Sequence, residues 1–371
     1  MSKLLKNLGP GFIAVLSGIE LTNVFMYMLF GKLYGVIGIA LVIASIIPMI
    51  FVQEAITVPK ILYGTTPSSY LLTHRKKLGM LYLITIYFGS LLILLINAII
   101  ISILLSNLFG GSWLPYLLIV VLISSLIPGN NRIGIYIEKI LAILSLFLMI
   151  YFIAFIVSIL DHPPTDLFSY SIPSLMMIIA LWGAASSPYS MLVQEDDNEL
   201  GDLKLSLFVS IIISLSISGV AAITGLHTDI ISALTLTSHG LYSYLLLVGL
   251  ISTTILALST IFITVGRIIS GSLQVLRART NEISQVFYSI IAFMFILSCI
   301  IIYVGWNMLE NLVIMGSALI GVISTIAMYP LLIYYLDIYL ASRNRLIAYN
   351  MLGLAATTAV LTIIILLGFL P

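Results

Sequence analysis

A short polar stretch, Ser17–Asn23, lies within an apolar segment that is otherwise uncharged from residue 8 to residue 31. It holds one carboxylate (Glu20), one amide, two hydroxyls and a glycine. A carboxylate deep in hydrocarbon is costly, so it usually faces a cavity or a partner. Small polar residues weaken a helix, and their oxygens are ligands that hard cations accept. The stretch predicts one half of a cation site.

A second interrupted helix is predicted at residues 182–189. Pro188 has no N–H to donate to the carbonyl four residues earlier, at Ala184, and that carbonyl then becomes available to a cation. Together the two breaks offer only oxygen atoms, which favours Mg²⁺ or Mn²⁺ over softer metals. The candidate ligand groups are the Glu20 carboxylate, the Asn23 amide, the Ala184 carbonyl and the hydroxyls of Ser17, Thr22, Ser186 and Ser187.

Both breaks also have plain structural interpretations. Glu20 could be a protonated acid hydrogen-bonded to a neighbouring helix. Residues 183–189 could form an ordinary proline kink, whose freed backbone groups find partners on adjacent helices. The occurrence of two breaks in one chain favours the functional interpretation of each.

Further polar residues lie inside the apolar segments. Glu54 is either a proton relay or inner-vestibule acid, or an end residue paired with Lys60 or Arg267. Asn97 is expected to make an interhelical hydrogen bond, with a place on the substrate or proton path as the alternative. Asp337 lies near a segment end and is expected to be solvated.

Composition places the chain in a bilayer. Of its 371 residues 61% are hydrophobic and only 8% are charged, against about 25% charged in soluble domains. The net charge of +1 argues against a nucleic-acid partner. The single cysteine, Cys299, allows no internal disulfide. No arrangement of nucleophile and base, Gly-rich loop or His-x-x-x-His pair indicates an enzyme, and no cofactor is expected.

Apolar runs of about 20 residues predict an all-α polytopic membrane protein. The eleven expected spans cover residues 10–32, 35–58, 79–107, 113–128, 137–160, 172–194, 204–226, 241–269, 284–304, 311–337 and 346–370. With the N-terminus in the cytoplasm, Lys32 is the one basic residue placed outside. This asymmetry follows the positive-inside rule and puts the C-terminus outside the cell membrane.

An internal repeat is visible when the numbering is shifted by 165 residues, so that Gly18 falls on Gly183. Five spans per unit require the second unit to be inverted. We therefore expect one transmembrane domain over residues 1–371, with repeat one at 9–160, repeat two at 172–338 and an extra helix at 346–370. Inverted repeats with interrupted helices in corresponding positions point to a transporter with its site near the midplane.

The motifs resemble those of the NRAMP family of divalent-metal transporters. Gly9-Pro10-Gly11-Phe12 followed by Glu20-Leu21-Thr22-Asn23 is similar to that family's first helix, and Gln53-Glu54 followed by Tyr63-Gly64-Thr65-Thr66 to the end of its second. Gly183-Ala184-Ala185-Ser186-Ser187-Pro188-Tyr189 resembles the sixth helix of a divergent branch with Ser-Pro-Tyr in place of Met-Pro-His.

The resemblance implies a LeuT-type fold of two inverted five-helix repeats plus one helix, 11 transmembrane helices in all. It places Glu20 and Asn23 at metal-ligand positions, Ala184 at the position of the coordinating carbonyl, and Ser187 at that of a methionine. Tyr189 stands where the family has a histidine associated with the proton route. Leu21 and Thr22 replace the Pro-Gly that opens the first helix, which predicts a milder break.

The expected function is secondary transport of a divalent cation, Mn²⁺ or Mg²⁺ rather than Fe²⁺, with protons as a candidate co-substrate. Two alternatives remain at this stage. One is a carrier of amino acids or other small organic solutes, whose half-helix N-termini would bind a carboxylate. The other is a non-transporting sensor or scaffold that binds a partner through the acidic loop 195–202. The lipid bilayer and the metal ion are the expected partners, and the sequence does not fix the oligomeric state.

Overall fold

The computed structural model describes residues 19–127, 133–160, 173–186, 188, 191, 200–224, 247–262, 265 and 309–368. Throughout these residues the regular structure is helical. Its elements are α3 (Leu21–Tyr63), α4 (Pro67–His74), α5 (Lys76–Phe109), α6 (Trp113–Leu126), α7 (Ile133–Leu160), α8 (Leu175–Ser186), α10 (Leu200–Thr224), α14 (Leu309–Ser342) and α15 (Arg345–Gly368). A further helical stretch runs over Leu247–Phe262.

Four of the described helices are long and apolar enough to cross a membrane. They are Leu21–Tyr63, Lys76–Phe109, Val313–Ser342 and Arg345–Gly368. The outer face of α15 carries exposed apolar side chains such as Leu352 and Leu366, whereas its buried stripe includes Asn350 and Thr358. Apolar residues outside and polar residues inside suit a lipid environment. The chain is a multi-pass membrane protein.

The helix α3 contains the second predicted span and part of the first, whose residues 10–18 lie outside the described residues. Gly35, at φ 53° and ψ −129°, breaks it into Leu21–Tyr34 and a second helix that continues to Tyr63. The second span was predicted to end at residue 58 and is longer, because Gly64 stops the helix. Gly64 adopts the left-handed conformation at φ 67°, and its N–H donates to the Lys60 carbonyl at 2.8 Å.

The short helix α4 was not among the predicted spans. Pro67 occupies its first turn, and the Thr66 hydroxyl accepts a hydrogen bond from the Ser69 N–H at 3.4 Å. Arg75 follows α4 and makes two hydrogen bonds to the Asp337 carboxylate on α14, at 2.8 and 2.9 Å. Asp337 was expected to be solvated. It is instead 16% exposed and ion-paired, because α4 folds back onto α14.

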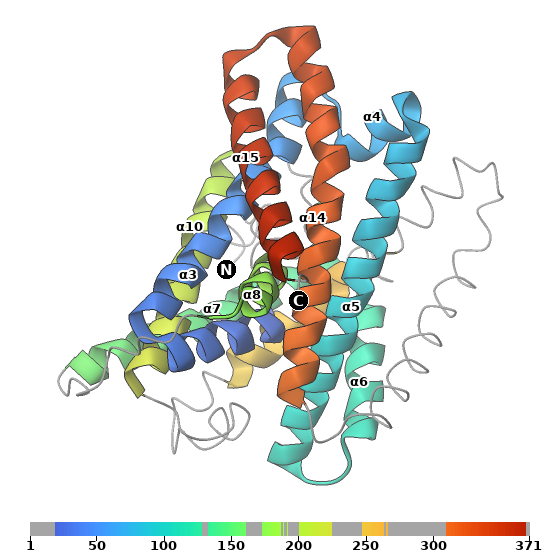
Figure 1. Cartoon of the computed structure of the whole chain (residues 1–371). Coiled ribbons are helices and arrows are strands. Elements are labelled where there is room, and N and C mark those ends of the chain that lie inside the picture. The colour runs from blue at the N-terminus through green and yellow to red at the C-terminus, as the bar shows by residue number, and fades with distance from the viewer. Residues whose placement is uncertain are drawn as a thin grey trace.

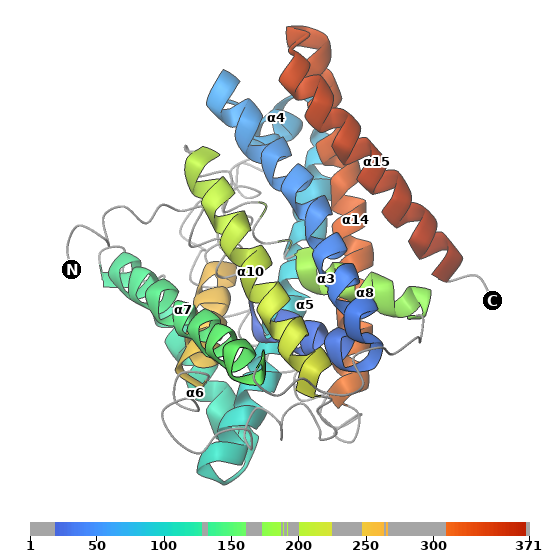
Figure 2. The ribbon, with the colours of Figure 1, turned by 90° about the vertical axis from the view of Figure 1, so that its left-hand side faces the viewer.

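The helices form a bundle with α4 at one end. Figure 1 shows α14 and α15 as an antiparallel pair whose connection lies at the α4 end, while the turn from α5 to α6 lies at the opposite end. In Figure 2, α10 runs along α3, and α7 and α15 lie on opposite sides of the bundle. One large apolar core joins α3, α5, α8, α10 and α14. The candidate site lies within this core.

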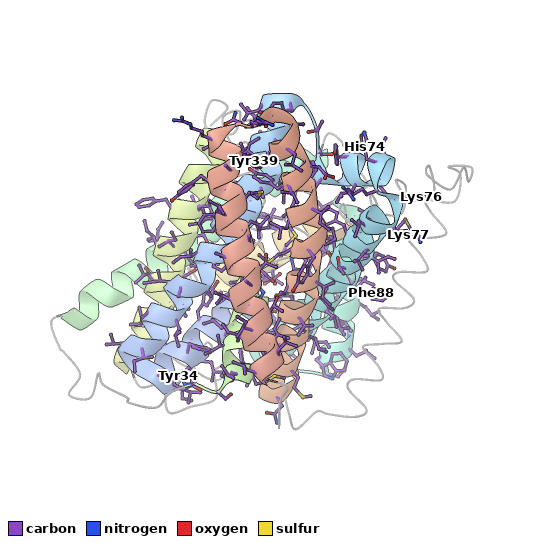
Figure 3. All side chains as sticks on the ribbon, turned by 45° about the horizontal axis from the view of Figure 1, so that its top comes forward. Tyr34, His74, Lys76, Lys77, Phe88 and Tyr339 are labelled. Carbon is purple, nitrogen blue, oxygen red and sulfur yellow. The ribbon has the colours of Figure 1, made fainter. Side chains whose placement is uncertain are left out.

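Several of the described basic residues lie at the α4 end. Figure 3 shows His74, Lys76 and Lys77 at one end of the bundle and Tyr34 at the other. Arg343 and Arg345 lie in the α14–α15 connection, also at the α4 end. Lys32 lies two residues before Tyr34. The separation agrees with the predicted grouping of basic residues on one side.

Candidate metal-binding site

Glu20 lies immediately before the first turn of α3. Its backbone is extended, with φ −87° and ψ 171°, and its side chain is fully buried. The Glu20 carbonyl accepts the Val24 N–H at 3.0 Å, which begins the helix. Leu21, Thr22 and Asn23 are helical, whereas Ile19 and Glu20 are not. A carboxylate at the N-cap position is favourable, because it faces the positive end of the helix dipole.

Asn97 on α5 caps the same helix end. Its Oδ1 accepts the Thr22 N–H at 3.1 Å, and its Nδ2 donates to the Ile93 carbonyl at 2.9 Å. The side chains of Asn97 and Thr22 are fully buried. The expected interhelical hydrogen bond of Asn97 is confirmed, and its partner is the backbone beside Glu20. Asn97 therefore fixes the first turn of α3, where Glu20 and Asn23 are attached.

The second half of the candidate site lies on α8. Ala184 is 1% exposed and Ser186 is fully buried. Pro188 cannot donate to the Ala184 carbonyl, and its ring packs against α5 beside Gly89. The Ala184 carbonyl is therefore the candidate cation ligand on this helix.

Gly183 has a role that the sequence interpretation missed. It was interpreted as a residue that weakens the helix, yet it is helical within α8. A Cβ at this position would overlap the Ser317 carbonyl of α14 and approach the Gly321 backbone nitrogen to 2.6 Å. Glycine is needed here because the backbones of α8 and α14 cross at close range. The close crossing fixes the position of this part of α8 against α14.

Two hydroxyl residues of α14 complete the contacts of α8. Ser186 and Ser324 share a hydrogen bond of 2.7 Å between their hydroxyls, and the Trp182 indole donates to Thr325 at 3.1 Å. Sequence reasoning did not identify Ser324 or Thr325, although a polar pair in the apolar run 311–337 was an available signal. Ser324 lies one hydrogen bond from a candidate site residue and is added to the set that positions the site.

The two halves belong to one packed core. Ile19 and Leu21, which flank Glu20, lie in the same buried cluster as Ala184 of α8, and α3 packs directly against α8. Tyr27 lies on α3 about two helical turns after Glu20. It lies beside Ser214 of α10 and within electrostatic range of Glu20. Among the described residues no three His, Cys, Asp or Glu side chains converge. A metal here would be held by one carboxylate and neutral oxygens.

Three predicted site residues, Ser17, Ser187 and Tyr189, lie outside the described residues. Glu54, the remaining predicted residue, is partly buried in the second half of α3, toward the α4 end. The arrangement therefore brings Glu20, Thr22 and Asn23 together with Asn97, and it places Ala184 and Ser186 on α8, which packs in the same core.

Comparison with known proteins identifies the fold. Neither the protein-family models nor the curated proteins give a match to this sequence. Solved structures of the manganese transporter of Eremococcus coleocola are similar over nearly the whole chain. The transporter in complex with an aromatic bis-isothiourea substituted compound gives a TM-score of 0.67 at 16% identity, covering 98% of this chain and 87% of that one. Two of its single-residue mutants give 0.69 and 0.68 at 16% identity, each covering 99% and 86%. The protein has the fold of a helical membrane transporter.

Proposed function

We propose that the protein is a secondary transporter that moves a divalent metal cation, Mn²⁺ or Mg²⁺ in preference to Fe²⁺, by alternating access. One observation carries the proposal: the fully buried Glu20 at the N-terminus of α3, in the same core as Ala184 of α8. The fold shared with the manganese transporter supports it. The motif resemblance supports the further proposal that the chain is a divergent member of the NRAMP family.

The chemistry of the candidate ligands supports a hard and exchangeable cation. Glu20 contributes one negative charge, and the Asn23 amide and Ala184 carbonyl contribute neutral oxygens. Such a set under-neutralises a divalent ion, so the ion would keep several waters and bind weakly. Weak binding suits transport, because the ion must also leave. The absence of sulfur from this ligand set disfavours selection of softer metals.

The groups at the N-terminus of α3 also favour a cation over an organic anion. The amino-acid alternative needs free backbone N–H groups at a half-helix N-terminus. At the α3 terminus the Thr22 N–H already donates to Asn97, and the Glu20 carboxylate would repel a substrate carboxylate. The acidic loop of the sensor alternative lies largely outside the described residues.

We propose that the α4 end of the bundle faces the cytoplasm, as the basic residues gathered there favour. Under this proposal the described C-terminal end of α15 points toward the outer face.

Uptake by reconstituted protein tests the function. Purified protein in liposomes is given Mn²⁺ or Mg²⁺ outside, and the ion inside is followed with a trapped fluorescent indicator. We expect saturable uptake by the wild type, with Glu20→Gln losing most of it. Ser90→Ala is a matched control, because Ser90 is a buried residue of α5 whose hydroxyl donates within its own helix at 2.6 Å. Equal uptake by Glu20→Gln and wild type would refute the site, and no divalent uptake by the wild type would refute the function.

A further inference from the structure

A second group of buried polar residues lies away from Glu20, where three helices meet. Tyr335 of α14 is fully buried and Asn350 of α15 is 2% exposed. The Tyr335 hydroxyl lies beside the Asn350 side chain and within electrostatic range of the Glu54 carboxylate on α3. Polar residues that converge from three helices inside an apolar bundle are uncommon, and they usually mark a functional site.

The packing of α15 on α3 explains why these residues meet. Gly353 of α15 lies against the ring of Phe51, where even a Cβ would overlap it. Closer to the α4 end, the Asn344 amide donates to the Tyr63 hydroxyl at 3.5 Å. The two helices therefore run antiparallel. Asn350 comes three residues before Gly353 and Glu54 comes three residues after Phe51, so Asn350 and Glu54 lie at the same height along the helix pair. The close contact of Gly353 with Phe51 fixes this alignment.

Two atoms of this group are hydrogen-bond donors that can still take an acceptor. Tyr335 Oη and Asn350 Nδ2 are buried, and within the part of the chain that the structure describes each has no neighbour for a hydrogen bond except the other. An ionised carboxylate is purely an acceptor and can take several hydrogen bonds. Glu54 is therefore the complementary group for both donors. When they engage it, they stabilise its charged form.

We propose that Glu54, Tyr335 and Asn350 form a proton-binding site separate from the Glu20 metal site. A proton binds to a carboxylate oxygen of Glu54. In the ionised state Tyr335 and Asn350 donate to the carboxylate and draw α14 and α15 toward α3. In the protonated state these hydrogen bonds weaken, so the helices are released. Proton occupancy is thereby linked to the relative positions of three helices. The use of this link to couple protons to metal transport rests on the proposed function, whereas proton binding does not.

Other ionisable groups lie around this site. On α3 itself Tyr63 is close enough to act on Tyr335, and on α5 the buried Tyr82 belongs to the same apolar cluster. The segment of α8 that packs on α3 contains no ionisable residue. Toward the α4 end the charged groups of the surrounding elements are Lys60 on α3, Lys76 and Lys77 on α5, Asp337 on α14 and Arg345 on α15, and α10 carries Asp202 and Lys204. Glu20, Lys32 and Glu310 belong to the N-terminal parts of α3 and α14. Glu54 is the carboxylate within electrostatic range of Tyr335 and at the level of Asn350.

Infrared spectroscopy tests proton binding without any need for transport. The full-length protein is titrated with acid, and the C=O absorption of protonated carboxyl groups is recorded. We expect one component of this absorption to disappear in Glu54→Gln. In Tyr335→Phe the same component should appear at a pH about one unit higher, since a lost hydrogen bond to a charged group changes a proton affinity about tenfold. Tyr334→Phe is the matched control, because its hydroxyl donates to the Thr65 carbonyl at 2.8 Å, and it should leave the component unchanged. An unchanged component in Glu54→Gln, or equal shifts in the two tyrosine variants, would overturn the proposal.

A second measurement separates this proposal from the metal site. Mn²⁺ uptake into liposomes is recorded over a range of external pH, with Mn²⁺ binding measured in detergent. We expect Glu54→Gln to bind Mn²⁺ like the wild type but to lose the pH dependence of uptake, whereas Glu20→Gln loses binding itself. Should Mn²⁺ fail to bind or move in the wild type, the transport proposal fails, and the infrared result alone decides proton binding. A full pH dependence in Glu54→Gln would contradict coupling through this site.

Discussion

The hydrogen bond between Asn97 and the first turn of α3 makes a prediction with a calculable size. In Asn97→Leu the Thr22 N–H keeps its buried position but loses its acceptor, which lies at 3.1 Å in the wild type. A lost helix N-cap costs about 0.5–2 kcal/mol. An orphaned buried donor costs about 1–3 kcal/mol. Interhelical hydrogen bonds in membranes average about 0.6 kcal/mol, with a maximum of about 1.7.

The larger values apply here, because Thr22 and Asn97 are both fully buried. The membrane average is small chiefly because polar groups find other hydrogen-bond partners when the native contact is lost. The Thr22 N–H differs, because it could reach another acceptor at this depth only if α3 moved. We therefore expect Asn97→Leu to lower the stability by about 1–2 kcal/mol. Fraying of the first turn would also displace Glu20 and Asn23, so Mn²⁺ affinity should fall in the same variant.

Thermal unfolding in detergent, followed by tryptophan fluorescence, measures the loss. The matched control is Ser90→Ala, a buried α5 position whose hydroxyl bonds only within the helix, to the Ile86 carbonyl at 2.6 Å. It should shift Tm far less than Asn97→Leu. Asn97→Asp keeps an acceptor oxygen in the same place and should recover part of the stability. If Asn97→Leu unfolds at the same temperature as Ser90→Ala, the capping argument is wrong.

Three further predictions concern the contacts of α14. Asp337 raises the pKa of the Arg75 guanidinium through a direct hydrogen bond, so this contribution to stability is fully present below the ordinary pKa of arginine and is lost only as the pH rises through the raised pKa. Arg75→Gln should therefore become easier to cleave by protease near α4 at low salt, with little pH dependence in the neutral range. Gly183→Ala forces a Cβ into the α14 backbone and should destabilise the protein by about 1–3 kcal/mol in a thermal-unfolding assay, whereas tolerance of alanine would contradict the close crossing. Ser186→Ala and Ser324→Ala should be non-additive by about 0.6 kcal/mol in a double-mutant cycle, and strict additivity would show that their 2.7 Å hydrogen bond contributes no energy.

The spans were predictable because apolar length is a strong signal in a membrane protein. The predicted span 79–107 corresponds to α5 at Lys76–Phe109, and 346–370 to α15 at Arg345–Gly368. The errors lie at the ends. The extension of α3 to Tyr63 depends on Gly64, and α4 was too short to register as an apolar run, although Thr66-Pro67 is a helix-start signal. The span predicted at 284–304 lies outside the described residues.

The site was only half predictable. The cost of a buried charge identified Glu20 without any structure, and an amide in an apolar helix identified Asn97 as a hydrogen-bonding residue. That Asn97 caps the helix beginning after Glu20 depends on a contact between residues 75 positions apart, which no local pattern contains. The close crossing of Gly183 on α14 and the Ser186–Ser324 pair are likewise tertiary facts. The assignment of Glu20, Asn23 and Ala184 as metal ligands stays a prediction.

Crystals of the protein soaked in Mn²⁺ give the most direct test of the metal site. Mn²⁺ scatters X-rays anomalously, so its position can be found without assumptions about the ligands. We predict a peak within coordination distance, or one water shell, of the Glu20 carboxylate, the Asn23 amide oxygen and the Ala184 carbonyl, and the loss of that peak in Glu20→Gln. A bound Mn²⁺ elsewhere, or a peak that survives in Glu20→Gln, would contradict the proposed site.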